Sequence, residues 1–342
     1  MKIRELFEEE KHEVNKNFGV FKNGNFRCTK LDNVSSLKGM PQEGVKNVFC
    51  YSSGISSLEG APIVINGEFD CQSNPKLKSL SYCPQEGVTS IRCNRCDLLT
   101  LTGAPKKIDG NFYCNENNSL RSLKGMSKEG VKNLHCFLCN LASLEGAPQK
   151  IDGEFDCSSN ENLTSLNGMS KEGVTNLFCT ACDISSLEGA PQKINGIFDC
   201  SENKNLTSLK GAPQEGVTDL DCKNCNLTSL EGAPKVIDGT LTAFGNPITS
   251  LKGVHKIIEE IDGLIYLPDM VKSNILGLLK IKKLKSVGFY ISEKFGNSSN
   301  FTETKHEISD IINKYLPNPN VEQIMDCQNE LIEAGYEEYA EL

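Results

Sequence analysis

The sequence predicts an α/β solenoid, in which short coils of chain stack along one axis. Cysteines recur at alternating steps of 22 and 21 residues, and a second cysteine series recurs every 43 residues. The first series is Cys28, Cys50, Cys71, Cys93, Cys114, Cys136, Cys157, Cys179, Cys200 and Cys222, with Ala243 next; the second is Cys96, Cys139, Cys182 and Cys225. A fixed period of this length is typical of repeat architectures, whose units bury their apolar sides against one another.

The repeating unit is a pair of coils, FDCSSNENLTSLNGMSKEGVTN (155–176) and LFCTACDISSLEGAPQKINGI (177–197). In each coil an apolar residue and a cysteine alternate with polar residues, which predicts a short strand with one buried side. After the strand, Asn160 or Cys182 is expected to turn inward and hydrogen-bond the backbone. The Gly-Ala-Pro segment at 189–191 breaks regular structure. We therefore expect a parallel β-sheet on the concave face and short non-helical returns on the convex side.

The second coil, written as Leu177-x-Cys179-x-x-Cys182-x-Ile184-x-x-Leu187, resembles the leucine-rich-repeat pattern LxLxx(N/C)xLxxL. The resemblance extends over about eleven coils, residues 23–253. It implies that the polar strand positions form a concave binding surface. The phrase LASLEGAPQKIDGEFDCS (141–158) and the ending DCQNELIEAGYEEYAEL (326–342) also resemble leucine-rich-repeat proteins encoded by tailed bacteriophages. That narrower resemblance implies a protein acting in the host cytoplasm, by capturing or inhibiting a host protein.

Composition argues against two classes of partner. The formal net charge of -9 disfavours a nucleic-acid backbone, whose recognition needs clustered Lys and Arg, and favours a basic protein partner. No apolar run approaches the roughly 18 residues of a membrane span, so we expect no membrane partner. The first residues, MKIRELFEEEKHEV, lack the apolar core of a signal peptide. The expected location is therefore cytoplasmic, where thiols stay reduced.

The CxxC pairs have two interpretations. In an intracellular protein this spacing is typical of a metal site or a redox pair. In a solenoid, however, successive CxxC pairs lie two coils apart, about 10 Å, so four thiolates cannot meet at the roughly 2.3 Å bond length of tetrahedral zinc. Free cysteine also behaves as a small buried apolar residue. We expect the cysteines to form the core, with no metal site and no cofactor.

The chain divides by pattern into three parts. Residues 1–17 are expected to form a capping helix, because an open solenoid end exposes core. Residues 18–268 form the solenoid, whose last coil, 261–267, is degenerate. Residues 269–342 are expected to be mainly helical and to cap the C-terminal end of the solenoid. Within this region we expect a basic helix at 271–283, a strand at 286–291, a loop near 296–300 and helices at about 303–316 and 319–340.

The polar strand positions contain more large rings than a solvated sheet requires. Exposed apolar clusters mark interfaces, and aromatic residues are favoured as anchors. Acidic residues follow in the later coils, where Glu154 and Asp219 add to them. The predicted partner-binding residues are Phe49, Tyr51, Tyr113, His135, Phe137, Asp156, Phe178, Asp199 and Asp221. Two alternatives remain: scattered surface rings are normal, and a terminal extension can fold back over the sheet.

No catalytic site is predicted. The four histidines, His12, His135, His255 and His306, form no recognisable motif with a nucleophile. Cys327 lies outside the repeat, and some bacterial leucine-rich-repeat effectors carry a helical ubiquitin-ligase domain with a catalytic Cys-x-Asp. Here the run is Cys-Gln-Asn, which does not match, and helical spacing favours a core role. The expected function is a non-enzymatic protein-binding module. The alternative is a structural component that self-associates through its terminal regions.

Overall fold

The computed structural model describes residues 19–28, 34–295 and 298–341. The chain divides into two compact units, one formed by residues 1–120 and 124–132 and the other by residues 121–123 and 133–342. Both are β-solenoids built from coils of 21 or 22 residues, about twelve in all, each of which adds one short strand to a parallel sheet. The predicted N-terminal helix, residues 1–17, lies outside the described residues.

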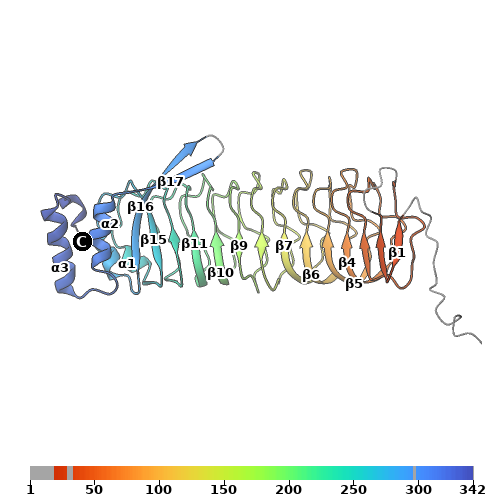
Figure 1. The fold of residues 1–342 in the computed structure, drawn as a ribbon, viewed down its shortest axis with the longest axis horizontal. Helices are drawn as coiled ribbons and strands as arrows, with labels where there is room; N and C mark the ends of the chain where they lie inside the picture. Colours follow the sequence, from red (N-terminus) through yellow and green to blue (C-terminus); the bar gives the residue numbers. More distant parts are fainter. Residues whose placement is uncertain (1–18, 29–33, 296–297, 342) are drawn as a thin grey trace, which may run out of the picture. The chain divides into compact units, whose positions relative to one another are not determined.

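The first unit opens with an antiparallel hairpin, and the strands that follow pair in parallel and in chain order (Figure 1). Its strands are β1 (Val20–Lys22), β2 (Asn25–Arg27), β3 (Asn47–Phe49), β4 (Val64–Asp70), β5 (Glu86–Arg92) and β6 (Lys107–Tyr113). From β2 to β6 each strand has a fully buried inward residue, as at Phe69, Ile91 and Phe112, whereas β1 has no buried residue. Strand β7 (Glu129–His135) begins among residues of the first unit and ends in the second.

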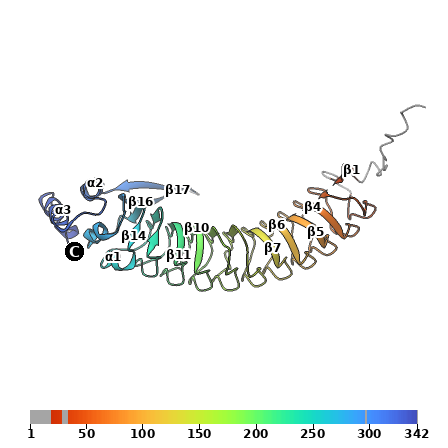
Figure 2. The same cartoon turned by 90° about the horizontal axis from the view of Figure 1, so that it is seen from below.

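The main sheet of the second unit has the same parallel pattern and ends with an antiparallel strand (Figure 2). Its main-sheet strands are β8 (Phe155–Asp156), β9 (Leu177–Phe178), β10 (Lys193–Asp199), β11 (Glu215–Asp221), β13 (Leu241–Thr242), β15 (Leu264–Pro268), β16 (Ser286–Phe295) and β17 (Ser298–Thr304). A smaller sheet pairs β12 (Val236–Ile237) with β14 (Glu260–Ile261). Leu241 pairs with Ile265 in parallel, so the degenerate coil is a true coil of the solenoid.

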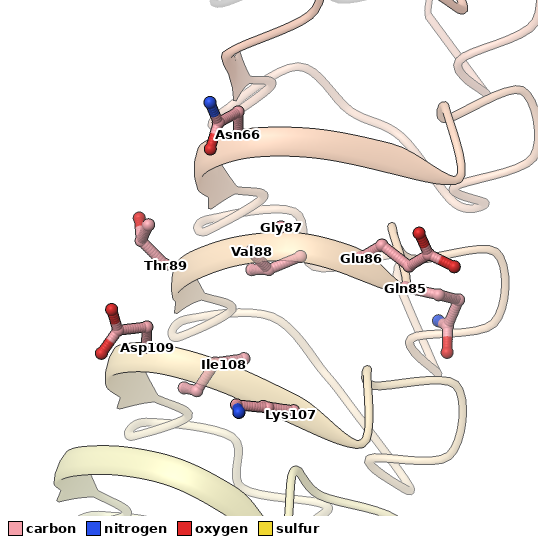
Figure 3. A pocket seen from close by; sticks show the side chains of 9 residues that line it. All are labelled: Asn66, Gln85, Glu86, Gly87, Val88, Thr89, Lys107, Ile108 and Asp109. Carbon is pink, nitrogen blue, oxygen red and sulfur yellow. The ribbon is translucent and has the colours of Figure 1, made fainter.

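In each 22-residue coil a Glu-Gly pair, such as Glu86-Gly87, forms one corner. Gly87 has φ +70°, and a Cβ there would lie 1.8 Å from the Ile65 carbonyl oxygen of the preceding coil. Only glycine fits this left-handed position at so close an approach. Beside this corner lies a pocket of about 420 Å³, in which Val88 and Ile108 lie between the polar side chains (Figure 3). Both apolar residues are buried members of the core.

The first cysteine of each coil is part of the core, and in most coils its thiol donates a hydrogen bond to the backbone of the next coil. The Cys179 thiol donates to the Asp199 carbonyl oxygen of the next coil at 3.4 Å, and Cys222 donates likewise to Thr242. In the second series, the Cys182 thiol donates to the Cys157 carbonyl oxygen of the preceding coil at 3.3 Å. Burial raises the pKa of Cys182 to about 11. Thiols that stay protonated and donate to backbone carbonyls serve the architecture, as expected.

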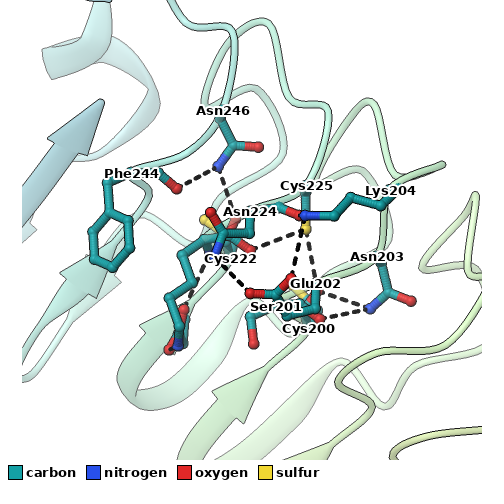
Figure 4. A network of polar contacts seen from close by, with 12 residues as sticks. Cys200, Ser201, Glu202, Asn203, Lys204, Cys222, Asn224, Cys225, Phe244 and Asn246 are labelled. Atoms are coloured by element: carbon teal, nitrogen blue, oxygen red, sulfur yellow. Dashed lines mark hydrogen bonds and ion pairs between the residues drawn. The ribbon is translucent and has the colours of Figure 1, made fainter. Parts of the chain in front are cut away.

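Asparagine takes the place of the second cysteine in alternate coils (Figure 4). The Asn203 amide nitrogen donates to the Cys179 and Cys200 carbonyl oxygens at 2.9 and 2.8 Å, and its side-chain oxygen accepts from the Ile184 N–H at 3.2 Å. The same arrangement recurs at Asn74, Asn117, Asn160 and Asn246. The predicted inward turn of asparagine is confirmed: it satisfies backbone groups where the short strands end.

The expected helix at 271–283 is replaced by a 3-10 turn, η1 (Ile275–Lys280). Its residues 275–279 are all buried, so this stretch lacks the solvent-facing polar side of an amphipathic helix. The basic run that follows is ion-paired, since Lys283 contacts Glu260 at 2.6 Å and Lys285 contacts Asp262 at 2.7 Å. A short helix, α1 (Val254–Ile257), precedes η1.

The expected strand at 286–291 is confirmed as part of β16, and it pairs with β17 where a loop was expected near 296–300. The two helices are shorter than expected: α2 (His306–Lys314) and α3 (Val321–Glu333), followed by the 3-10 turn η2 (Glu337–Tyr339). The α3 helix stops before Gly335, whose φ is +85°. Asn313 of α2 exchanges two hydrogen bonds with the Val287 backbone, which fixes the helix to β16. Of the helices in the described residues, none has the length and apolarity required to cross a bilayer.

Candidate partner-binding surface

In the second unit, one outward residue from each strand lies in a line across the sheet, which we call the sheet row. Strand register pairs each member with the next. The row consists of His135, Asp156, Phe178, Asp199, Asp221, Thr242 and Tyr266, all half-buried. Adjacent strands lie about 4.8 Å apart, so neighbouring side chains of the row are within contact distance. Five of the nine residues predicted to bind a partner therefore form a contiguous surface.

Three carboxylates of the sheet row are held by the backbone that follows them. The Oδ1 atoms of Asp156 and Asp199 accept the N–H of the residue two positions on, at 3.0 and 2.9 Å. Asp221 makes the same bond with Lys223 and also forms an ion pair with it. Burial raises the pKa of Asp221, and the contact with Lys223 opposes that shift. The carboxylates are therefore oriented before any partner arrives.

Phenylalanine lies among these acids. Phe178 pairs with Asp156 on one side and with Asp199 on the other. Phe137 follows His135 by two residues, so it points to the same side of the sheet, and both rings are half-buried. A ring with carboxylates on either side presents an apolar surface inside a negative field.

The C-terminal end of the sheet row is covered. Phe244 is only 6% exposed, and its ring centroid lies 5.8 Å from that of Tyr290 on β16. Tyr290 also contacts Tyr266 edge-on, at 5.2 Å between centroids. These contacts come from β16, a strand beyond the repeat that pairs with β15, and they involve none of the nine predicted residues. The part that remains open to a partner runs from His135 to Asp221.

The three predicted residues of the first unit, Phe49, Tyr51 and Tyr113, are also half-buried. Two of them already have cationic partners. The Arg27 guanidinium lies 4.2 Å from the ring centroid of Phe49, and that of Arg92 lies 4.4 Å from Tyr113. Each contact is a cation–π interaction within the unit. The rings of the first unit are therefore less available than those of the second.

The structure also groups residues that the sequence did not group. His135, Glu154 and Asp156 each place one donor atom within 4.8 Å of the other two. Glu154 was noted only as an addition to the acidic strip, and no metal ligand was expected. The signal was present in the repeat: a step of 21 residues places Asp156 beside His135, and Glu154 shares the side of the strand with Asp156.

Cys327, the cysteine outside the repeat, is fully buried in α3 together with Leu331. Burial raises the pKa of its thiol to about 12. A protonated and inaccessible thiol is a poor nucleophile. The core role expected from helical spacing is confirmed.

No family model matches the chain, and no curated protein matches it. Among solved structures, the chain is similar to the functional domain of InlJ from Listeria monocytogenes, which is described as including a cysteine ladder. The identity is 15%, over 81% of this chain and 83% of that one, with a TM-score of 0.19. A similarity of this size carries no information about function.

Proposed function

We propose that the chain is a leucine-rich-repeat protein that binds a protein partner on the sheet row of its second unit. The observation that carries the proposal is the half-exposed Phe178 between oriented carboxylates, with Phe137 nearby. A rigid ring loses little conformational entropy on burial, and aromatic residues dominate interface energetics.

The chemistry of the row defines the kind of partner. Asp156 and Asp199 favour lysine or arginine, whereas Asp221 already has Lys223 as its ion-pair partner. The Phe rings provide faces on which a guanidinium or an ammonium can stack. Complementary charge accelerates association and excludes acidic competitors. The favoured partner is therefore a basic protein segment with apolar residues at its centre.

The proposed setting follows from sequence. The repeat phrase and the C-terminal ending resemble proteins encoded by tailed bacteriophages, and the chain carries a net charge of -9. On this basis the chain acts in the cytoplasm of an infected bacterium, where it captures or inhibits a host protein. The role is non-enzymatic, and it involves neither a nucleic acid nor a membrane.

The test is affinity capture from bacterial lysate with the wild type and with Phe137→Ser/Phe178→Ser. We expect a basic protein retained by the wild type and lost by the double variant. Tyr82→Ser is the matched control, because Tyr82 is a 64% exposed ring of the first unit. Identical profiles for wild type and double variant would refute binding at the row. A melting temperature lowered by many degrees in the double variant would show that the rings belong to the core.

A second function, self-association through the terminal region, is favoured by the surface of α3. Val321, Met325 and Ile332 are 75%, 57% and 43% exposed. Their spacing places them on one side of the helix, where they form an apolar stripe. Met325→Glu is expected to convert a concentration-dependent oligomer into a monomer in sedimentation analysis. A wild type that is monomeric at every concentration would exclude this function.

A further inference from the structure

We infer that His135, Glu154 and Asp156 form a binding site for a divalent transition-metal ion, with Zn²⁺ as the ion that best fits the donor set. His135 ends β7, Glu154 directly precedes β8 and Asp156 ends β8, so all three residues belong to the second unit. The site does not depend on the proposed binding of a protein partner.

The distances are close to those of a coordination sphere. The three donor atoms lie within 4.8 Å of one another, and His135 Nδ1 is 3.5 Å from a carboxylate oxygen of Glu154. Zinc bonds of about 2.0–2.2 Å at tetrahedral angles place ligand atoms roughly 3.3–3.5 Å apart. One pair is therefore already at that separation. The others lie within 4.8 Å and need to close by at most about 1.3 Å, which rotation of partly exposed side chains can supply.

The convergence is built by strand register. His135 and Asp156 are direct partners on the adjacent strands β7 and β8. Glu154 precedes Asp156 by two residues, so both carboxylates point to the same side of the sheet. The Glu154 N–H donates to the Asn133 side chain at 2.7 Å, and Asp156 Oδ1 accepts from the Ser158 N–H at 3.0 Å. The second bond orients the Asp156 carboxylate before metal binds, and the first fixes the backbone at Glu154.

The chain contains its own comparison. The segment Glu68-Phe69-Asp70 of the first unit has the same sequence as Glu154-Phe155-Asp156. There the preceding strand supplies Phe49 as the register partner of Asp70, and Arg92 of the following strand forms an ion pair with Glu68. A guanidinium has no lone pair to give a metal. At 154–156 the preceding strand supplies His135 in place of Phe49, and the following strand supplies Phe178 in place of Arg92. The same two carboxylates therefore lie beside a metal-binding nitrogen and have no guanidinium in register.

The donor set selects the metal. Imidazole nitrogen favours Zn²⁺, Cu²⁺ and Ni²⁺ over Mg²⁺ and Ca²⁺, which prefer an all-oxygen shell. Two carboxylates neutralise the charge of a divalent ion. Three protein ligands leave a fourth tetrahedral position on the solvent side, open to water or to another donor.

The experiment is isothermal titration of the full-length protein with Zn²⁺, and with Mg²⁺ for comparison. We expect one zinc ion per chain with a Kd below about 0.1 mM, and much weaker magnesium binding. His135→Gln, Glu154→Gln and Asp156→Asn should each weaken zinc binding by more than about tenfold. The matched control, Glu68→Gln, should bind zinc as the wild type does.

The cysteines are the competing ligands, and Co²⁺ distinguishes them. A cobalt ion bound by nitrogen and oxygen lacks the intense near-ultraviolet charge-transfer band that thiolate ligands produce. A strong thiolate band, zinc binding unchanged by His135→Gln, or no zinc binding at millimolar concentration would each overturn the inference. Circular dichroism of each variant establishes that a loss of binding is not a loss of fold.

Discussion

The buried asparagines that recur in alternate coils, which we call the asparagine column, are Asn74, Asn117, Asn160, Asn203 and Asn246. Their contribution to stability can be tested by replacing Asn203 with alanine. The side chain is fully buried and bonds the backbone of its own coil and of the preceding one. In Asn203→Ala, the Ile184 N–H and the Cys179 carbonyl lose these partners without access to water. The Cys200 carbonyl keeps the thiol of Cys225, which donates to it at 3.3 Å.

The expected loss of stability comes from these two unpaired backbone groups. A buried backbone group left without a partner costs about 1–3 kcal/mol, so two groups lower the free energy of unfolding by about 4 kcal/mol. This is a large fraction of the roughly 5–15 kcal/mol that stabilises a typical domain. The control is Asn226→Ala, because Asn226 is exposed, and a surface change of this kind usually costs less than about 0.5 kcal/mol.

Amide hydrogen exchange is the appropriate assay, because coils of a solenoid can open separately. Protection of the Ile184 amide should fall by about a thousandfold in Asn203→Ala, since each 1.4 kcal/mol is about a factor of ten. Guanidinium unfolding, followed by circular dichroism, measures the global effect in parallel. If Asn203→Ala loses no more protection than Asn226→Ala, these buried groups find other partners, and the asparagine column does not stabilise the solenoid.

Three further predictions concern turns, thiols and charge. Gly173→Ala should destabilise the protein by several kcal/mol more than Gly253→Ala in thermal melts. Both glycines have positive φ, but only at Gly173 does an added Cβ meet a backbone oxygen, at 1.7 Å. Ellman's reagent should leave the 16 buried thiols of the native protein almost unreacted, with Cys28 labelled first because a hydrogen bond with Cys50 lowers its pKa. Burial raises the pKa of Asp70, so its ionised form destabilises the fold at neutral pH, and this cost disappears as pH falls through the raised pKa. Asp70→Asn should therefore raise the melting temperature at pH 7, and the gain should shrink toward pH 4; a gain independent of pH would contradict this.

The repeat could be predicted because its information is local. Alternation of polar and apolar residues defines each strand, and the spacing of Cys182 or Asn160 defines the inward turn, so the coils follow directly from sequence. The helix predicted at 271–283 is wrong because residues 275–279 are buried on all sides in a 3-10 turn, a packing that the sequence pattern does not reveal.

The candidate surface could be predicted only in part. Alternation shows that Phe49 and Phe178 point outward, but not that Arg27 stacks on Phe49. Such a contact depends on the rotamers of long side chains on separate coils. The covering of Phe244 by Tyr290 comes from a strand outside the repeat, so nothing in the repeat pattern signals it.

The alternation of asparagine and cysteine coils also constrains how such a gene can change in length. Removal of one pair of coils, residues 177–219, would leave each junction joining the same two coil types as before. Removal of a single coil, residues 177–197, would place the coil of Asn203 directly after the coil of Asn160. Asn203 would then lose the Ile184 N–H and the Cys179 carbonyl, which both belong to the removed coil. Recombination is therefore expected to add or delete whole pairs, and homologous chains should differ in length by multiples of 43 residues, the period of the second cysteine series.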